Sequence, residues 1–336
     1  GSTYDVLIAT FEIFALLVII AVSAFWIRRN IMRIRRFLKP EMKGWPKKDA
    51  DYILYIELVL MFLFLTMNAS DYWLQQHPEG QSYYTQAGHF PISSLFTPLF
   101  DGMSYATVVT IERTSWWLPI IRILAFLNYL YYSKHLHIIL AFPNTFYANL
   151  NPLGRFSHSE AVANEVKLMM DPSADPYASP AIESEPISFG AADVKDLNRI
   201  QLMNAYSCTE CGRCTDVCPA NQTGKKLSPR KIMMDTRDRL EQLGKQLDRG
   251  LAIDDKTLLD HHISREELWA CTTCNACVEA CPISIDPLSI IMDMRQYLVM
   301  EQSSAPSELN AMMTNIENNG APWPFNQQDR INWINE

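Results

Sequence analysis

Long apolar runs fill the first 150 residues of the chain. The first run, residues 6–27, contains 22 residues with little polar interruption. At about 1.5 Å per residue, a helix of that length reaches about 33 Å, which is enough to cross the hydrocarbon core of a bilayer. Two further runs extend over about 52–73 and 116–142. The pattern predicts three membrane-spanning helices within residues 1–150.

Basic residues set the predicted orientation of these helices. Residues 28–48 carry nine Lys and Arg, and the next basic residue is Arg113. Because short loops rich in Lys and Arg stay in the cytoplasm, the segment 28–48 is predicted to be cytoplasmic and the loop 74–112 external. Residues 90–111 are apolar, but two prolines and Asp101 assign them to that external loop. Three spans then place the N-terminus outside and the C-terminal half inside.

The composition changes after residue 150. Residues 151–188 are rich in Pro and Ser among small and acidic residues, which predicts an extended linker without a core of its own. Residues 189–300 show helical periodicity and few strand signals. Ser264 and Glu267 form a capping-box pattern at the start of one expected helix. The predicted fold class is all-α, with a transmembrane helical anchor of about three spans and an α-helical soluble domain.

Charge and hydropathy exclude two classes of function. The chain has 336 residues, with 29 Lys and Arg against 37 Asp and Glu, and a formal charge of −8. Proteins that bind nucleic acid normally carry a basic excess or a basic stripe, so no nucleic-acid partner is expected. The mean hydropathy of −0.07 argues against a transporter that is embedded in the membrane along its whole length.

All eight cysteines lie in two runs of identical spacing, each followed by Pro. The runs are Cys208, Cys211, Cys214 and Cys218, and then Cys271, Cys274, Cys277 and Cys281. This is the run of bacterial two-cluster ferredoxins, in which three closely spaced thiolates wrap one face of an iron–sulfur cube. Zinc sites favour separate CxxC pairs, and disulfide scaffolds spread their cysteines through small secreted chains. The spacing therefore predicts two [4Fe-4S] clusters.

In two-cluster ferredoxins the fourth cysteine of each run binds the other cube. The first cluster is therefore assigned to Cys208, Cys211, Cys214 and Cys281. The second is assigned to Cys271, Cys274, Cys277 and Cys218. This crossed ligation would join segments more than fifty residues apart, so loss of iron should loosen the whole domain. Since every ligand position is a cysteine, the clusters are expected to transfer electrons, and no catalytic residue is predicted in this chain.

The histidines argue against a heme that this chain holds alone. A b-type heme needs two axial histidines, usually on helices that face each other. Among the seven histidines, only His135 and His137 adjoin a predicted span. Two residues apart on one helix, they are expected to point about 200° away from each other.

Charged and titratable residues near the predicted spans provide a second candidate site. Glu12 and Arg122 lie at similar depth near the outer end and are expected to pair. Glu57 lies near the inner end, at the depth of His135 and His137, so these three residues are a candidate quinone or proton site. Snorkelling and helix pairing explain the same three residues equally well.

From residue 189 onward the sequence resembles the iron–sulfur subunits of heterodisulfide-reductase-like oxidoreductases. It is similar to their small ferredoxin-type subunit, to the iron–sulfur subunit of anaerobic glycerol-3-phosphate dehydrogenase, and to membrane-bound electron-transfer-flavoprotein:menaquinone oxidoreductases. The two cysteine runs and IENNGAPWPF at 316–325 carry this resemblance. Residues 116–139 look like the last span of a nitrate-reductase-gamma-type cytochrome b domain, with Pro119 where that family has a heme ligand. Residues 1–150 are therefore interpreted as a degenerate, heme-less cytochrome-b-like anchor.

The resemblance also implies partners. In the relatives, a segment like NNGAPWPF leads into cysteine-rich CCG domains, whereas no Cys follows Cys281 here. We therefore expect a separate CCG-domain iron–sulfur subunit, a flavoprotein or both, docked by residues 301–336.

The expected function is that of an electron-transfer subunit, not itself a catalyst, of a membrane oxidoreductase complex. The resemblance implies a multi-pass protein of the prokaryotic cytoplasmic membrane, with the ferredoxin domain at 189–300 on the cytoplasmic side. It would pass electrons between the catalytic partner and menaquinone. Two alternatives stay open: a b-type quinol oxidoreductase in its own right, and a structural anchor whose clusters mainly stabilise the fold.

Overall fold

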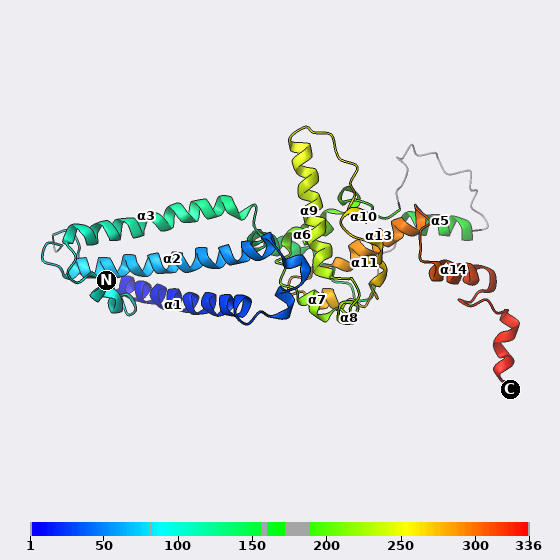
Figure 1. Ribbon diagram of the computed structural model, residues 1–336, viewed down its shortest axis with the longest axis horizontal. Coiled ribbons are helices and arrows are strands. Elements are labelled where there is room, and N and C mark those ends of the chain that lie inside the picture. The colour runs from blue at the N-terminus through cyan, green and yellow to red at the C-terminus, as the bar shows by residue number, and fades with distance from the viewer. Residues whose placement is uncertain (1, 81, 156–159, 172–188, 335–336) are drawn as a thin grey trace. The chain divides into compact units, whose positions relative to one another are not determined.

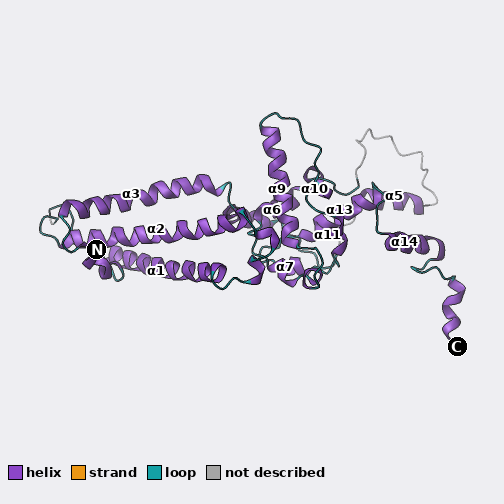
Figure 2. Ribbon diagram, viewed as in Figure 1, coloured by secondary structure: helices purple, strands orange, loops and turns teal. Residues whose placement is uncertain are grey.

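The computed structural model describes residues 2–80, 82–155, 160–171 and 189–334. Every regular element in these residues is a helix (Figure 2), which confirms the all-α prediction for the described part of the chain. The chain divides into two compact units: residues 1–143 with 206–212, and residues 144–205 with 213–336.

Three long helices make up most of the first unit (Figure 1): α1 (Ser2–Asn30), α2 (Trp45–Gln76) and α3 (Tyr105–Leu130). Helix α2 packs against both α1 and α3. Helices α1 and α2 are long and apolar enough to cross a membrane. Helix α3 has 26 residues but is not among these candidates, and its sequence includes the charged residues Glu112, Arg113 and Arg122. The prediction of three spans is thus corrected to two candidate spans among the described residues.

The third predicted span, residues 116–142, does not form one helix. Helix α3 ends at Leu130, and the chain passes through the 3-10 helix η4 (Lys134–Leu136) into α4 (His137–Phe146). The Ser133 hydroxyl caps η4 by accepting from the backbone N–H of His135 at 3.1 Å. At this break the carboxylate of Asp49 on α2 accepts from the Ser133 hydroxyl and from the backbone N–H of Lys134.

A buried carboxylate joins α1 to α2 and to the loop after α2. Glu12 is fully buried and accepts from the Asn68 side chain at 3.1 Å and from the backbone N–H groups of Ile92 and Ser93 at 2.8 and 3.1 Å. These amides begin a 3-10 helix and have no partner within it. The prediction that Glu12 pairs with Arg122 is wrong. Besides η4, the 3-10 helices in this unit are η1 (Arg35–Phe37), η2 (Pro40–Met42) and η3 (Ser93–Phe100).

The second unit is built around α9 (Pro229–Asp248) and α13 (Pro287–Met300), which pack against each other. Its most buried apolar side chains include Leu258, Ile263, Leu268, Ile290 and Ile291. Between residues 189 and 300, the other helices with residues in this unit are α6 (Arg199–Ser207), α7 (Arg213–Val217), α8 (Pro219–Gln222), α10 (Leu258–His261), α11 (Arg265–Ala270), α12 (Ala276–Glu279) and η5 (Val194–Asp196).

The predicted capping box at the start of α11 is confirmed. The backbone N–H of Glu267 donates to the Ser264 hydroxyl at 3.3 Å, and the backbone N–H of Ser264 donates to the Glu267 carboxylate at 2.9 Å. The two residues satisfy each other's backbone donors, which fixes where the helix before the second cysteine run begins.

Part of the predicted linker is helical. Residues 151–188 contain α5 (Glu160–Met170), where an extended chain was expected. The stretches 156–159 and 172–188, which include most of its prolines, lie outside the described residues. The C-terminal segment 301–336 contains α14 (Ser307–Asn319) and the 3-10 helix η6 (Gln327–Ile334).

Candidate functional site

Four of the eight cysteines line one cavity in the second unit. They are Cys218, Cys271, Cys274 and Cys277. Three come from the second run, and Cys218 ends the first run, at the start of α8. Apolar side chains complete much of the wall, among them Leu227, Leu288 and Ile291. The structure thus brings together the four residues that crossed ligation assigns to one cluster.

The donor set of this cavity suits an iron–sulfur cube. Soft sulfur donors select iron–sulfur clusters, zinc or copper(I), and no carboxylate is among the described residues that line the cavity. Burial raises the pKa of the Cys271 thiol and raises that of Cys277 to about 12. Such thiols ionise when a bound metal supplies positive charge. Among the described residues, no three His, Cys, Asp or Glu side chains converge on a single metal ion. This agrees with a cube, because its four cysteine sulfurs each bind a different iron and therefore lie farther apart than the ligands of one ion.

The two cysteine runs share an unusual backbone geometry. In the first, Glu210 and Gly212 have φ of +58° and +75°; in the second, Thr273 and Asn275 have φ of +55° and +60°. Three of these residues are not glycine, and for them this left-handed conformation is unfavourable. It lets a backbone N–H turn back to sulfur: Glu210 donates to Cys208 and Thr273 donates to Cys271, each at 3.4 Å. Hydrogen bonds to cysteine sulfur are among the features that tune iron–sulfur clusters.

A half-buried cation lies beside the second run. The guanidinium of Arg295 on α13 donates to the carbonyls of Leu268 and Cys271, each at 2.6 Å, and lies over the Trp269 ring at 5.0 Å from its centroid. The guanidinium therefore fixes the backbone carbonyl of Cys271 and brings a positive charge close to the cysteine-lined cavity. No feature of the cysteine pattern predicts this residue.

The ligands assigned to the first cluster are divided between the two units. Cys208 and Cys211 belong to the first unit, whereas Cys214 and Cys281 belong to the second. Within the second unit, Cys214 lies on α7 and Cys281 follows α12, and these two helices pack together. The first cluster therefore stays a prediction from the spacing.

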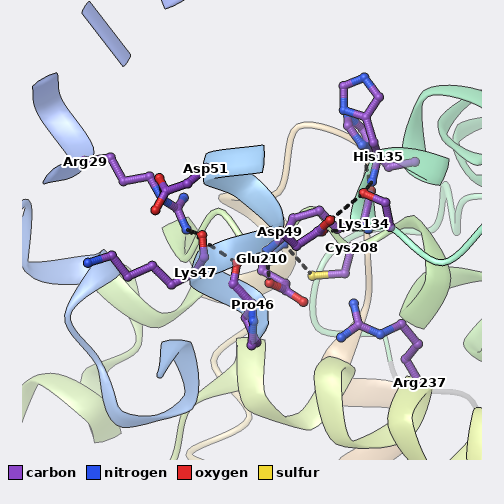
Figure 3. A network of polar contacts seen from close by, with 12 residues as sticks. Arg29, Pro46, Lys47, Asp49, Asp51, Lys134, His135, Cys208, Glu210 and Arg237 are labelled. Atoms are coloured by element: carbon purple, nitrogen blue, oxygen red, sulfur yellow. Dashed lines mark hydrogen bonds and ion pairs between the residues drawn. The ribbon is translucent and has the colours of Figure 1, made fainter. Parts of the chain in front are cut away.

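The first unit contains a buried polar network (Figure 3). Asp49 near the start of α2 is 1% exposed. Its carboxylate accepts from the Tyr129 hydroxyl, from the Ser133 hydroxyl at 2.9 Å and from the backbone N–H of Lys134 at 3.1 Å. These contacts hold the turn after α3, where the predicted span 116–142 is interrupted.

Lys134 links this turn to the first cysteine run. Its ammonium group forms an ion pair with the carboxylate of Glu210 and donates to the carbonyl of Pro46 at 2.6 Å. The two charged side chains are only 8% and 2% exposed. Burial lowers the pKa of Lys134, and Glu210 opposes that change. Glu210 lies between Cys208 and Cys211, and no pattern in the sequence indicates its partner.

Lys134 also lines a cavity of about 290 Å³. Apolar and aromatic side chains form its walls, and cationic or titratable groups and Thr209 complete them. The lining residues are Phe25, Arg28, Arg29, Arg36, Phe37, Ala50, Ile53, Leu54, Lys134, His135, His137 and Thr209. All of them belong to the first unit.

The cavity contains two of the three residues of the candidate quinone site. His135 and His137 both line it, with ring centroids 5.5 Å apart. The prediction that the two rings point away from each other is wrong, because the chain turns through η4 instead of continuing α3. Glu57 is not among the lining residues and lies one turn along α2 from Ile53 and Leu54. Burial lowers the pKa of His135, and the neighbouring His137 adds to that effect.

Comparison with known proteins agrees with the cysteine pattern. Residues 207–285 match the family model of a 4Fe-4S dicluster domain. The whole chain aligns at 28% identity with 47% of the probable iron-sulfur-binding oxidoreductase FadF of Bacillus subtilis. Over 90% of its length it is 26% identical to EtfAB:quinone oxidoreductase of Syntrophomonas wolfei, covering 43% of that protein.

A third relative belongs to the dihydromethanophenazine:CoB–CoM heterodisulfide reductase of Methanosarcina mazei. This component of the reductase is 28% identical over 42% of the present chain and 36% of its own length. The chain spans about half the length of the first two relatives, and no solved structure matches it. The resemblance to heterodisulfide-reductase-like and electron-transfer-flavoprotein:quinone oxidoreductases is thus confirmed, and the 4Fe-4S dicluster domain at residues 207–285 carries it.

Proposed function

We propose that this chain is a membrane-anchored electron-transfer subunit with two [4Fe-4S] clusters. It passes electrons between a catalytic CCG-type or flavin partner and menaquinone. The observation that carries the proposal is the shared cavity of Cys218 with Cys271, Cys274 and Cys277. A bound [4Fe-4S] cluster supplies reversible electron transfer at a potential that its surroundings set.

The chain's own residues would hold the two clusters. Cys218 and the first three cysteines of the second run would bind one cube. Cys208, Cys211, Cys214 and Cys281 would bind the other. The repeated left-handed geometry, with amide donors to Cys208 and Cys271, supports equivalent roles for the two runs.

The proposed membrane anchor rests on α1 and α2. Apolar side chains of α1 such as Phe14 and Ile20 are 56% and 57% exposed. In the most apolar stretch of 18 residues in each helix, only 17% of α1 and 28% of α2 is buried within the structure. Lipid would cover apolar surface of this extent, which soluble proteins rarely expose. The basic segment 28–48 would then lie on the cytoplasmic side of a prokaryotic cytoplasmic membrane. The proposed cytoplasmic place of the ferredoxin domain also requires α3, which packs against α2, to return the chain across the membrane.

The proposed partner surface lies in the segment 301–336. Its aromatic and aliphatic side chains are exposed, with Phe325 at 65%, Ile331 at 60% and Trp333 at 74%. Aromatic residues of this kind are enriched at protein interfaces. The names of the relatives agree with a multi-subunit enzyme, since one is part of a heterodisulfide reductase and another is an EtfAB:quinone oxidoreductase.

Iron and sulfide analysis of the full chain, purified anaerobically in mild detergent, tests the clusters. We expect about eight irons and about eight sulfides per chain, as two cubes require. Cys277→Ser should lose about half of the iron. Thr272→Val, which alters the same cavity lining without touching a thiol, should lose none. Stoichiometric zinc in the wild-type chain, or equal iron in both variants, would contradict the proposal.

Mass spectrometry of proteins that co-purify with the chain tests the partner. A stoichiometric CCG-domain or flavin subunit is the expected result, and it should be lost when residues 320–336 are removed. A large assembly without any redox protein would instead favour a structural anchor.

A further inference from the structure

The cavity beside Lys134 is less cationic than its lining suggests. At least two of its four cations have acidic partners: Arg29 pairs with Asp51 at 3.4 Å, and Lys134 pairs with Glu210. Much of the positive charge at this site is therefore balanced by the protein itself. A ligand can therefore bind here without carrying the full negative charge of a phosphate.

The walls of the cavity suit a flat apolar ring. Phe25 from α1, Phe37 from η1, and Ile53 and Leu54 from α2 contribute aromatic and aliphatic surface. The volume of about 290 Å³ is near the lower end of small-molecule pockets, which run from about 300 to about 1,000 Å³. Small-molecule sites typically combine such walls with a few polar groups that orient the ligand.

The two histidines provide those polar groups. The Nδ1 of His137 lies 3.0 Å from the carbonyl of Lys134. A carbonyl only accepts, so Nδ1 is the donor in this contact, and in the tautomer that carries its proton on Nδ1 the Nε2 atom is an acceptor. His135 lines the same cavity 5.5 Å away, centroid to centroid, and its ring can donate. A donor and an acceptor suit a ligand that alternates between carbonyl and hydroxyl oxygens.

The cavity also touches the first cysteine run. Thr209, a lining residue, is flanked in the sequence by Cys208 and Glu210. Glu210 is tied to Lys134, so the same lysine contacts the cysteine run and lines the cavity. A ligand in this cavity would therefore lie against residues next to a proposed cluster ligand, which is the placement that a redox-active ligand needs.

We propose that this cavity binds the headgroup of a lipophilic quinone, between His135 and His137 and the apolar residues of α1 and α2. The proposal rests on the proposed electron-transfer function and specifies where its quinone binds. It replaces Glu57 of the sequence-predicted site with Lys134 and Thr209 as neighbours of the ring.

The test measures binding of menadione, a naphthoquinone without a lipid tail, to the full chain in detergent by equilibrium dialysis. Leu54→Trp fills the cavity, and His135→Phe keeps a ring but removes its hydrogen bonds. Val59→Trp, an exposed apolar position on the same helix, is the matched control. We expect the dissociation constant to rise about tenfold or more in the first two variants and to stay unchanged in the third.

Iron content and electron transfer to ferricyanide, measured on the same samples, separate this proposal from the proposed function. If wild-type clusters are intact but menadione binds all four proteins equally, the cavity proposal is overturned and the electron-transfer function stands. If the chain holds no iron, the electron-transfer function fails, whatever menadione does. A third outcome is that wild-type protein binds no menadione, and that Leu54→Trp and His135→Phe, but not Val59→Trp, lose phosphatidylglycerol that co-purifies with the wild type. The occupant of the cavity is then an acidic lipid, and the quinone proposal is wrong.

Discussion

The fully buried side chain of Arg239 on α9 holds three segments of the ferredoxin domain. Its Nε and Nη2 each lie 3.0 Å from an oxygen of Asp193, and its Nη1 lies 2.7 Å from Asp254. Asp193 is itself 2% exposed and also accepts from the backbone N–H of Leu258 at 3.0 Å. Replacement of Arg239 by Met would leave the Asp193 carboxylate buried with most of its donors removed.

The expected loss of stability is large. Breaking a buried ion pair by removing one partner costs about 3–5 kcal/mol, mainly because the other charge stays buried. For a domain of about 150 residues or more, each kcal/mol lowers the melting temperature by about 2–4 °C. We therefore expect Arg239→Met to melt about 10 °C below wild type. The double variant Arg239→Met with Asp193→Asn also removes the unpaired carboxylate charge, so it should recover part of that stability.

Lys245→Met is the matched control, since Lys245 lies on the same helix and pairs with Glu241 at 3.3 Å while 62% exposed. Such i,i+4 pairs contribute about 0.2–0.5 kcal/mol, so this melting temperature should change by at most about 2 °C. The assay heats the anaerobic full chain in detergent at one fixed scan rate and follows the visible absorbance of the clusters. Equal melting temperatures for Arg239→Met and Lys245→Met would refute the reasoning.

Three further predictions concern individual side chains. Arg295→Leu removes a half-buried positive charge beside Cys271 and should lower the reduction potential of the cluster proposed there, whereas Arg295→Lys should retain most of that potential. A redox titration followed by electron paramagnetic resonance measures both variants. Burial lowers the pKa of His262 below its ordinary value of 6.5, so the unfolded chain takes up the proton first and stability falls as pH drops below 6.5. His262→Gln should therefore lose less melting temperature than wild type between about pH 7 and about pH 5.5. Asp49→Leu leaves the turn donors of Ser133 and Lys134 without their acceptor and should make the turn after α3 more sensitive to protease.

Each of these predictions has a contrary outcome. An unchanged potential in Arg295→Leu would mean that the guanidinium only supports the carbonyl of Cys271. The same acid sensitivity in His262→Gln and wild type would show that other groups control stability in that range. Unaltered proteolysis of Asp49→Leu would mean that η4 forms without the carboxylate.

Features that depend on neighbours along the chain were predictable from the amino-acid sequence. The spacing of the cysteines within each run indicates the cluster type, because the three ligands proposed for one cube come from a stretch of seven residues. The apolar runs predicted α1 and α2, because hydropathy is a property of a continuous segment. The capping box of Ser264 and Glu267 was predictable for the same reason, since both partners lie within one helical turn.

Features that depend on distant residues required the folded chain. At the break in the predicted span 116–142, Asp49, which is more than eighty residues away along the chain, accepts from Ser133 and Lys134. Glu12 takes its donors from Asn68 and from the loop after α2 and not from Arg122.

The cavity shows the same division. Its histidines could be named from their predicted depth, but Lys134, Glu210 and Thr209 became part of the site only when folding joined the turn after α3 to the first cysteine run. A buried charge is stable only beside a partner of opposite charge or a set of hydrogen-bond donors. The linear pattern shows that such a partner is required, and only the packed chain determines which residue it is.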